Sequence, residues 1–492
     1  MCSRTLKTAS AILFCRVLAF DSHACRYQLA EYRISIYGKD AGEWDTLAKW
    51  VVNHRLLSPN VRWLIQIPRI FSTLSRAGSL LNFEEMLSNI FRPLFETTID
   101  PSSHPFLHKF LQHVVGFDSV DDESLPEWKL HNTPKSSIGK PLYFTKEQDN
   151  PPYNYYLYYM WANISVLNRL RMSVPRRGYR EFSFRPHAGE AGLVDHLAGA
   201  FLLSDGLSHG IVAKSSPSMQ MLLYLSQIGV AMSPMSNNSL FVHYNDNPFD
   251  TFFRRGLNLS LSTDDPLQFH YTTQPLIEEY GVASTVWHYS SADMCEIARN
   301  SVLQSGFEDG LKSHWLGPRF GHGASGNDMN KSNVPDERLR FRERNLKEER
   351  DFFSRCKKMH DDAKMARRAA LPPVSVPQTP QIRPSAGSPV ESTSALQSFA
   401  SLTRPKAASH HASGKMSPLL TCSSPKKSYC PSSPFSSPIT SVFSFFPVFS
   451  IVSHWFSEAR PPSQLLVILP RFPPSVPASF TAPYSTIIVA RS

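Results

Sequence analysis

The sequence contains no C-x-x-C pair, although it has seven cysteines in 492 residues. The cysteines are scattered singly along the chain: Cys2, Cys15, Cys25, Cys295, Cys356, Cys422 and Cys430. Closely spaced cysteine pairs are the usual basis of thiolate zinc sites and of disulfide frameworks. Their absence argues against both classes and indicates a reducing compartment, so we predict a cytosolic protein.

Long apolar runs and a clear targeting signal are also missing. A spanning helix needs about 20 mostly apolar residues, and the uncharged run 439–455 is interrupted by Pro447 and four serines. Near the start, the short apolar run 9–15 is followed at once by Arg16, and no small-residue cleavage site comes after it. We therefore expect no membrane association and no secretory signal.

Acidic residues are scarce at the C-terminal end. Residues 371–492 hold nine Lys or Arg against two Asp or Glu, and they contain 20 of the 39 prolines. Such a composition cannot build a regular core, so we predict a disordered Pro/Ser-rich tail over 371–492. Because this tail carries most of the net charge of +10, the basic balance does not indicate a nucleic-acid partner for the folded part.

Residues 26–330 alternate between short β-rich runs and amphipathic helical stretches, which is the pattern of repeated βα units in a parallel α/β fold. The candidate strands are Arg33–Tyr37, Val61–Ile67, Val114–Ser119, Glu181–Phe184, Leu207–Ala213, Gly229–Ser233 and Leu257–Ser262. Helical patterns between them include Trp44–Val52, Leu80–Phe91, Pro152–Leu170 and Ser218–Gln227. A charge-dense stretch, 334–370, has opposite charges at three- and four-residue spacing and predicts a solvated helix.

Each predicted strand from the second onward ends in polar or charged residues. These are Arg69, Asp121 with Asp122 and Glu123, His187 with Glu190, His209, Asn237 with Asn238, and Asp264 with Asp265. The C-terminal ends of parallel strands meet at one face of a barrel. The sequence therefore predicts that the functional side chains lie together at one end of the sheet.

Three of these groups are suited to a metal site. His187 and Glu190 stand three residues apart, and an imidazole can ligate zinc while a nearby carboxylate moves a proton. His209 is followed by a glycine, and Asp264 and Asp265 are adjacent carboxylates. Taken singly, each has a plainer explanation: a structural loop, a hydrogen-bonded histidine, and a helix N-cap. Their order on consecutive strands favours a shared site.

Eight segments resemble sequences of AMP deaminases, which belong to a superfamily of zinc-dependent barrel hydrolases. They are HAGEAG (187–192), LSHG (207–210), AMSPMSNNSLF (231–241), SLSTDDPLQFH (260–270), AEYRISIYG (30–38), IQIPRI (65–70), GFDSVDDES (116–124) and DMCEIARNSVLQSGF (293–307). The resemblance runs from about Cys25 to about Phe353. It implies a parallel (β/α)8 TIM-type barrel, a Zn2+ cofactor, hydrolysis of AMP to IMP and ammonia, and a homo-oligomer.

The resemblance also implies roles for individual residues. His187 and Asp264 match the zinc ligands of the family, and His209 matches the catalytic acid/base. Glu190 matches the group that binds the purine and protonates its N1. The stretch that matches the substrate-contacting residues is Asp265, Pro266, Leu267 and Gln268.

One family motif is absent. The family has an H-x-H pair at the end of its first barrel strand, and no H-x-H occurs in this sequence. We therefore expect a barrel that lacks its first strand, with an unmatched segment 1–24, an incomplete deaminase barrel over 25–333, the charged helix 334–370 and the tail. With two ligands in place of three, we expect weak zinc binding and poor or no AMP deamination.

Two alternatives stay open. The chain could be a truncated or non-catalytic homologue that binds nucleotide or pairs with a complete subunit. Alternatively, the Pro-rich tail could be the working part and dock to modules that read polyproline II.

Overall fold

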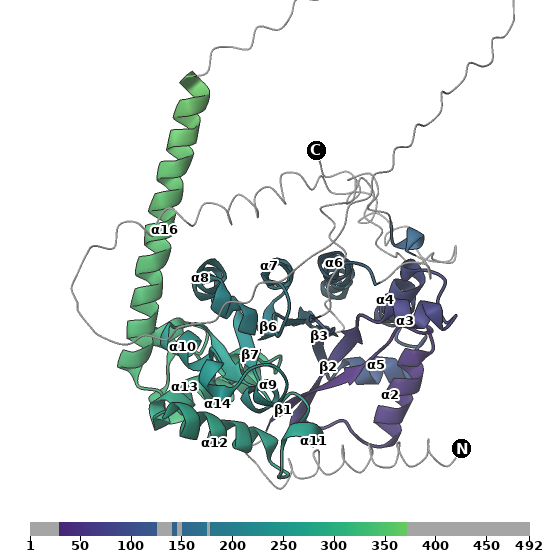
Figure 1. The fold of residues 1–492 in the computed structure, drawn as a ribbon. Helices are drawn as coiled ribbons and strands as arrows, with labels where there is room; N and C mark the ends of the chain where they lie inside the picture. The colour runs from purple at the N-terminus through teal and green to yellow at the C-terminus, as the bar shows by residue number, and fades with distance from the viewer. Residues whose placement is uncertain (1–28, 125–139, 145–149, 175–177, 371–492) are drawn as a thin grey trace, which may run out of the picture. The chain divides into compact units, whose positions relative to one another are not determined.

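The computed structural model describes residues 29–124, 140–144, 150–174 and 178–370 of the chain. The described residues up to Lys357 belong to one compact unit, and residues 358–370 belong to a second. In the first unit, parallel strands lie at the centre and helices surround them (Figure 1). The predicted tail and the predicted segment 1–24 lie outside the described residues.

All strand pairing among the described residues is parallel and follows the order of the chain. The strands form two sheets, β1-β2-β3-β4 and β5-β6-β7-β8. Their bounds are β1 Ala30–Ser35, β2 Val61–Pro68, β3 Val114–Val120, β4 Ser183–Phe184, β5 His187–Ala188, β6 Gly206–His209, β7 Gly229–Met232 and β8 Leu259–Leu261.

The strands β4 and β5 are two ends of one extended segment that joins the two sheets. The Phe184 carbonyl accepts a hydrogen bond from Asp205 N at 2.8 Å, and the Pro186 carbonyl accepts one from Ser208 N at 3.0 Å. Pro186 has no N–H to give to the ladder, which explains the interruption between β4 and β5. If β4 and β5 are counted as one strand, the described residues form seven strands.

The predicted α/β fold with parallel strands is confirmed, and each of the seven predicted segments overlaps a strand. The first segment, Arg33–Tyr37, was placed two to three residues too late, since β1 is Ala30–Ser35. A second boundary was also wrong. The prediction continued a strand to Ala213, but β6 ends at His209 and a 3-10 turn covers Ile211–Ser215. Gly210 adopts φ 62°, a left-handed conformation that ends an extended strand. Among the described residues, no strand pairing joins β8 back to β1.

The helices of the first unit lie outside the strands in Figure 1. Their bounds are α2 Glu43–Asn53, α3 Phe71–Arg76, α4 Phe83–Ile99, α5 Pro105–Leu111, α6 Tyr153–Met172, α7 Val194–Leu203, α8 Pro217–Ser226, α9 Pro234–Leu240, α10 Phe249–Arg254, α11 Pro266–Phe269, α12 Pro275–Trp287, α13 Ser291–Gln304, α14 Asp309–Leu316 and α15 Met329–Ser332. The last helix, α16 Asp336–Ala370, begins in the first unit and ends in the second. The four helices predicted between the strands correspond to α2, α4, α6 and α8, and the helix predicted over 334–370 corresponds to α16.

The inner faces of the helices and the strands share one large hydrophobic core. Helix α2 shows how the sequence places a helix there: Trp44, Ala48 and Val51 recur at helical spacing and are fully buried. The indole Nε1 of Trp44 also donates a hydrogen bond to the carbonyl of Ile90 at 2.8 Å. Packing of this kind holds the strand ends, and thus the polar residues on them, in fixed positions.

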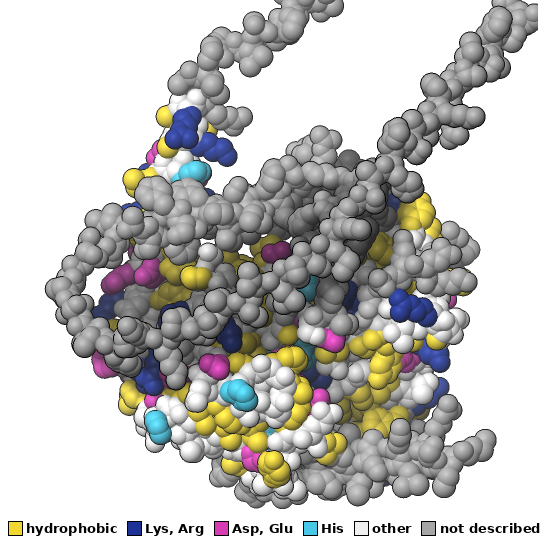
Figure 2. Space-filling view, in the orientation of Figure 1, with side chains coloured by type: hydrophobic (Ala, Val, Ile, Leu, Met, Phe, Trp, Pro, Cys, Tyr) yellow, Lys and Arg dark blue, Asp and Glu magenta, His cyan; other side chains and the backbone are white. Residues whose placement is uncertain are grey.

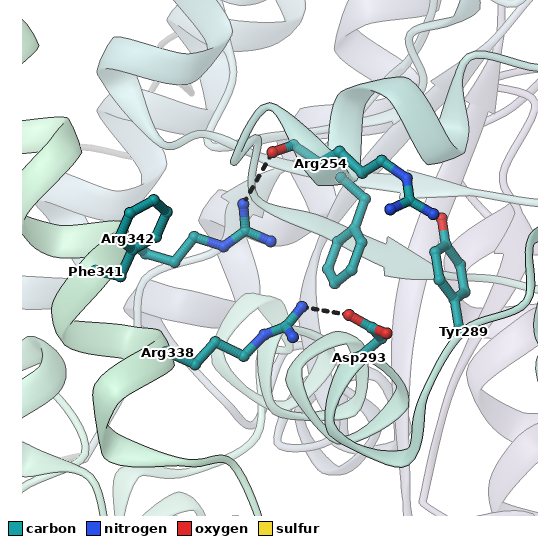
Figure 3. A pocket seen from close by; sticks show the side chains of 7 residues that line it. Arg254, Tyr289, Asp293, Arg338, Phe341 and Arg342 are labelled. Atoms are coloured by element: carbon teal, nitrogen blue, oxygen red, sulfur yellow. Dashed lines mark hydrogen bonds and ion pairs between the residues drawn. The ribbon is translucent and has the colours of Figure 1, made fainter.

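The base of helix α16 is held on the first unit by arginines (Figure 3). Arg338 forms an ion pair with Asp293 at 2.5 Å, and Arg342 donates a hydrogen bond to the Arg254 carbonyl at 3.3 Å. Both guanidinium groups also lie against the ring of Phe253, at 5.6 and 5.1 Å from its centroid. The guanidinium groups of Arg338 and Arg342 are therefore engaged with the protein itself.

Charged side chains of both signs are interspersed on the face shown in Figure 2. Among the described side chains visible in this view, Lys and Arg do not gather in one large patch. Each helix of the described residues is too short or too polar to cross a membrane.

At the N-terminal ends of the strands, a buried ion pair joins β1 to the β4–β5 segment. Arg185 Nη1 lies 2.8 Å from Glu31 Oε2, and these side chains are 14% and 16% exposed. Glu31 also accepts a hydrogen bond from Gly306 N at 2.6 Å. The pair thus links three segments that are far apart in the sequence.

We expect Arg185→Met to lower the free energy of unfolding by about 3–5 kcal/mol, because it leaves the Glu31 charge buried without its partner. Urea denaturation followed by circular dichroism measures this change. Arg180→Met is the matched control, because Arg180 pairs with Glu308 at the surface, where a pair contributes about 0–1 kcal/mol. Equal losses of stability in the two variants would contradict the stabilising role of the Arg185–Glu31 pair.

Candidate metal centre

Three side chains meet at the C-terminal ends of the strands: His187, His209 and Asp264. Their potential ligand atoms all lie within 4.8 Å of one another. His187 Nε2 is 3.9 Å from Asp264 Oδ1, and the two imidazole rings are 4.9 Å apart between centroids. The side chains come from β5, the end of β6 and the segment after β8. These three residues could hold a metal ion.

Two of the three residues have unusual backbone conformations. His209 has φ 72° and Asp264 has φ 53°, both in the left-handed region that residues other than glycine rarely adopt. Such conformations cost about 1–3 kcal/mol each and persist only where the surroundings enforce them. The side chain of Asp264 is held by Ser236, whose hydroxyl donates a hydrogen bond to Asp264 Oδ2 at 2.6 Å. Two of the six described non-glycine residues with positive φ thus belong to the cluster.

His187 is held by a carboxylate beneath it. Asp118, which is fully buried in β3, accepts hydrogen bonds from His187 Nδ1 at 2.9 Å and from the His187 backbone N at 3.1 Å. Arg33 of β1 pairs with the other carboxylate oxygen at 2.7 Å. Burial by itself would lower the pKa of His187, but the Asp118 charge outweighs it and raises that pKa to about 10. With Nδ1 engaged, Nε2 is the ring atom turned toward Asp264.

Glu190 lies beside His209, with Oε1 at 3.4 Å from His209 Nδ1. Burial, and after it the negative charge of Asp264, raises the pKa of Glu190 to about 7. This carboxyl group can therefore carry a proton near neutral pH, as a general acid must. Its loop is fixed by Glu123, whose Oε2 accepts a hydrogen bond from Gly189 N at 2.7 Å.

His209 is neutral at physiological pH. Burial, and after it the nearby positive charge of His187, lowers the pKa of His209 to about 3. The Nδ1 atom lies 3.2 Å from the side-chain amide nitrogen of Asn237. The Nε2 atom is buried and has no hydrogen-bond partner among the residues that the structure describes. An unsatisfied ring nitrogen here is consistent with a site that receives a ligand.

The predicted substrate stretch lies next to the cluster. Asp265 immediately precedes α11. Burial, and after it the negative charge of Asp264, raises the pKa of Asp265. Pro266, Leu267 and Gln268 are the first three residues of the short helix α11, and Leu267 is 71% exposed. This stretch directly follows Asp264 of the cluster.

A second buried pair anchors this stretch. His270 Nε2 lies 3.0 Å from Glu279 Oε1 of α12, and Glu279 also accepts a hydrogen bond from Met235 N at 3.2 Å. Burial, and after it the Asp264 charge, raises the pKa of Glu279 to about 8. These contacts tie the segment after β8 to the start of α9.

Sequence reasoning missed several residues of the site, among them Arg33, Asp118 and Asn237 as partners of the cluster. A signal was present for two of them, since a charged residue inside an otherwise apolar strand must find a partner on burial. Asn237 was noted only as a polar residue at a strand end. Its contacts depend on the fold and are not visible in the sequence.

Histidines and carboxylates clustered at the C-terminal ends of parallel strands are typical of metal-dependent α/β enzymes. The sequence model for AMP deaminase matches residues 11–359. The chain therefore belongs to the AMP deaminase family. The match starts earlier in the chain than the resemblance noted above.

Curated relatives agree with this assignment. A probable AMP deaminase of Oryza sativa subsp. japonica is 55% identical over 334 residues, which are 68% of this chain and 40% of the relative. The AMP deaminase of Dictyostelium discoideum is 55% identical over 329 residues, and these cover 67% of this chain and 40% of the relative. The chain thus spans about 40% of the length of these relatives.

Among solved structures, the adenine deaminase of Arthrobacter aurescens is similar over 56% of this chain and 77% of its own. Its sequence identity is 17% and the TM-score is 0.30, which adds nothing to the family assignment.

We expect the affinity for Zn2+ to rise with pH between 6 and 8. In the metal-free protein His187 has its pKa raised to about 10, so binding at Nε2 must displace a proton. Loss of one proton per bound ion predicts about a tenfold gain in affinity per pH unit. Competition with a chromophoric chelator, corrected for the protonation of the chelator, measures it. An affinity that does not change with pH would show that His187 is not a ligand.

Proposed function

We propose that this chain carries AMP deaminase chemistry, the hydrolytic conversion of AMP to IMP and ammonia. The observation that carries the proposal is the position of Glu190. Its carboxyl group has a pKa raised to about 7 and lies 3.4 Å from His209, beside the His187–Asp264 cluster. Membership of the AMP deaminase family supports AMP as the substrate.

The metal we propose is Zn2+, held by His187 Nε2 and Asp264 Oδ1. One imidazole nitrogen and one carboxylate oxygen 3.9 Å apart suit this ion. When bound, zinc lowers the pKa of water to about 7 and makes hydroxide available as a nucleophile at neutral pH. Because the proposal gives the metal two side-chain ligands, we expect activity to depend on added Zn2+ and to be slow.

The protein's own residues would handle the purine and the protons. In its protonated form, Glu190 gives its proton to N1 of the purine while water attacks C6. Neutral His209 accepts one proton of the water and passes it to the amino group, which leaves as ammonia, and the second proton of the water returns to Glu190. We assign contacts with the substrate to the stretch Asp265–Gln268. Homo-oligomerisation and a cytosolic location stay predictions.

We expect Glu190→Gln to lower turnover of AMP by about 10²–10⁴-fold at saturating Zn2+, because glutamine cannot supply the proton. Its zinc content should equal that of the unchanged protein, since Glu190 is not a proposed ligand. His187→Ala should lose the metal as well as the activity. IMP formation measures turnover, and metal analysis measures zinc content.

Glu337→Gln is the matched control, because Glu337 is 84% exposed on α16. It should turn over AMP at the rate of the unchanged chain. Loss of zinc in Glu190→Gln would overturn the assigned role of Glu190. A complete lack of IMP formation by the unchanged chain at saturating Zn2+ would favour the alternative, a homologue that does not catalyse.

A further inference from the structure

Large apolar side chains are exposed on or next to three helices that follow strands β7 and β8. Helix α9 packs against α11 and α12, and hydrophobic side chains are visible over these helices in Figure 2. We name these residues the apolar face: Leu240, Phe241, Leu267, Tyr271 and Ile277. Single exposed apolar residues are ordinary, but several on adjoining elements are typical of an interaction surface.

The backbone beneath the apolar face is held by two carboxylates of α12. Glu278 accepts hydrogen bonds from Tyr271 N at 3.1 Å and from Thr272 N at 2.6 Å. Glu279 Oε1 lies 3.0 Å from His270 Nε2. Tyr271 is 94% exposed although its backbone is fixed by these contacts. The face is therefore available to a partner without a rearrangement of the loop.

The charge around the apolar face is negative. Asp246 follows α9 and Asp265 precedes α11, and both are exposed. None of α9, α11 and α12 contains a Lys or Arg. Over residues 215–298 as a whole, eight Asp or Glu stand against two Arg. A partner that fits this face should therefore be apolar and positively charged.

This charge argues against pairing of the apolar face with the same face of a second copy. A two-fold symmetric contact brings identical surfaces together. The carboxylates around the face would then oppose those of the other copy, and like charges repel each other across an interface. A basic partner has no such repulsion.

The chain itself contains a segment with the complementary character. Residues 404–427, named here the basic segment, hold no Asp or Glu and five basic residues: Arg404, Lys406, Lys415, Lys426 and Lys427. The apolar residues Met416, Leu419 and Leu420 lie between Lys415 and Lys426. Residues 371–403 connect the segment to α16 and can extend over about 110 Å, which is about twice the diameter of a domain of roughly 300 residues.

We propose that the basic segment docks on the apolar face of the same chain, with its apolar residues against the face and its lysines near the surrounding carboxylates. Because the segment is tethered, its local concentration is about millimolar, so a weak contact is sufficient. Leu267 of the face belongs to the stretch Asp265–Gln268, to which we assign contacts with the substrate. The docked segment therefore competes with AMP, and this consequence rests on the proposed function.

Photo-cross-linking in the full-length chain tests the docking without AMP. Tyr271→p-benzoylphenylalanine places a photoreactive group on the apolar face, and mass spectrometry of the digested product identifies the residues that it reaches. We expect cross-links to the basic segment. Tyr143→p-benzoylphenylalanine is the matched control, because Tyr143 is 61% exposed and lies outside the face. It should give at least about fivefold fewer cross-links to the basic segment, and equal yields from the two positions would overturn the proposal.

Isotope labelling distinguishes docking within one chain from contacts between copies. Chains labelled with 15N and unlabelled chains are mixed before irradiation. We expect each cross-linked pair of peptides to carry one isotope only. Pairs that combine the two isotopes would overturn the proposal, whether they join the face to the basic segment or to the face of a second copy.

Reversal of the charge of the basic segment tests the electrostatic part of the contact. The triple variant Lys415→Glu, Lys426→Glu and Lys427→Glu should lower the cross-link yield from position 271 by about fivefold or more, because attraction to the carboxylates becomes repulsion. The matched control makes the same change of charge elsewhere in the tail: Arg460→Glu, Arg471→Glu and Arg491→Glu. Its yield should equal that of the unchanged tail, and equal losses in the two triple variants would overturn the assignment to the basic segment.

Turnover of AMP by the same variants separates the docking from the proposed function. The variant with the reversed basic segment should have a kcat/KM for AMP about 2–10-fold higher than the unchanged chain, because the competing segment is released. An unchanged kcat/KM beside a lowered cross-link yield would confirm the docking and contradict the assignment of substrate contacts to Asp265–Gln268.

Discussion

The buried carboxylate of Asp118 is the interaction on which the rest of the site depends. It is completely inaccessible to solvent, accepts hydrogen bonds from the ring and the backbone of His187, and pairs with Arg33. Removing one partner of a buried charge pair costs about 3–5 kcal/mol, because the other charge is left uncompensated. The same contacts tie β1, β3 and β5 together, so the geometry of the sheet and the orientation of His187 are set by one group.

The opposite wall of the site is built from α9. Ser236 holds Asp264 in its left-handed backbone conformation, and Asn237 contacts both His209 and Glu190. A carboxylate contacts the ring of one histidine and an amide contacts the ring of the other, although both rings lie in the same cluster. The strained backbone at His209 and Asp264 is the cost of aiming both side chains inward.

The sequence alone was sufficient for the strands and for the residues that follow them. Alternation of β-rich and amphipathic segments located all seven strands, and polar residues after them predicted that His187 and Asp264 would meet. The sequence did not predict the contacts between segments that are far apart in the chain. Asp118 is 69 residues from His187, and no local pattern links the two. The 3-10 turn after His209 was missed because its residues, Ile211–Ala213, are apolar like a strand, and the conformation of Gly210 is visible only in the structure.

The most direct test of this account is the zinc affinity of Asp118→Asn in the full-length chain, with folding checked by circular dichroism. Loss of a carboxylate behind a ligating histidine typically lowers metal affinity by about 10–100-fold, and we predict a loss in that range. Asp122→Asn is the control, because Asp122 is exposed in the loop after β3 and its Oδ1 accepts a hydrogen bond from Ser124 N at 3.1 Å. Unchanged zinc affinity in a folded Asp118→Asn protein would contradict the claim that the Asp118–His187 pair organises the metal centre.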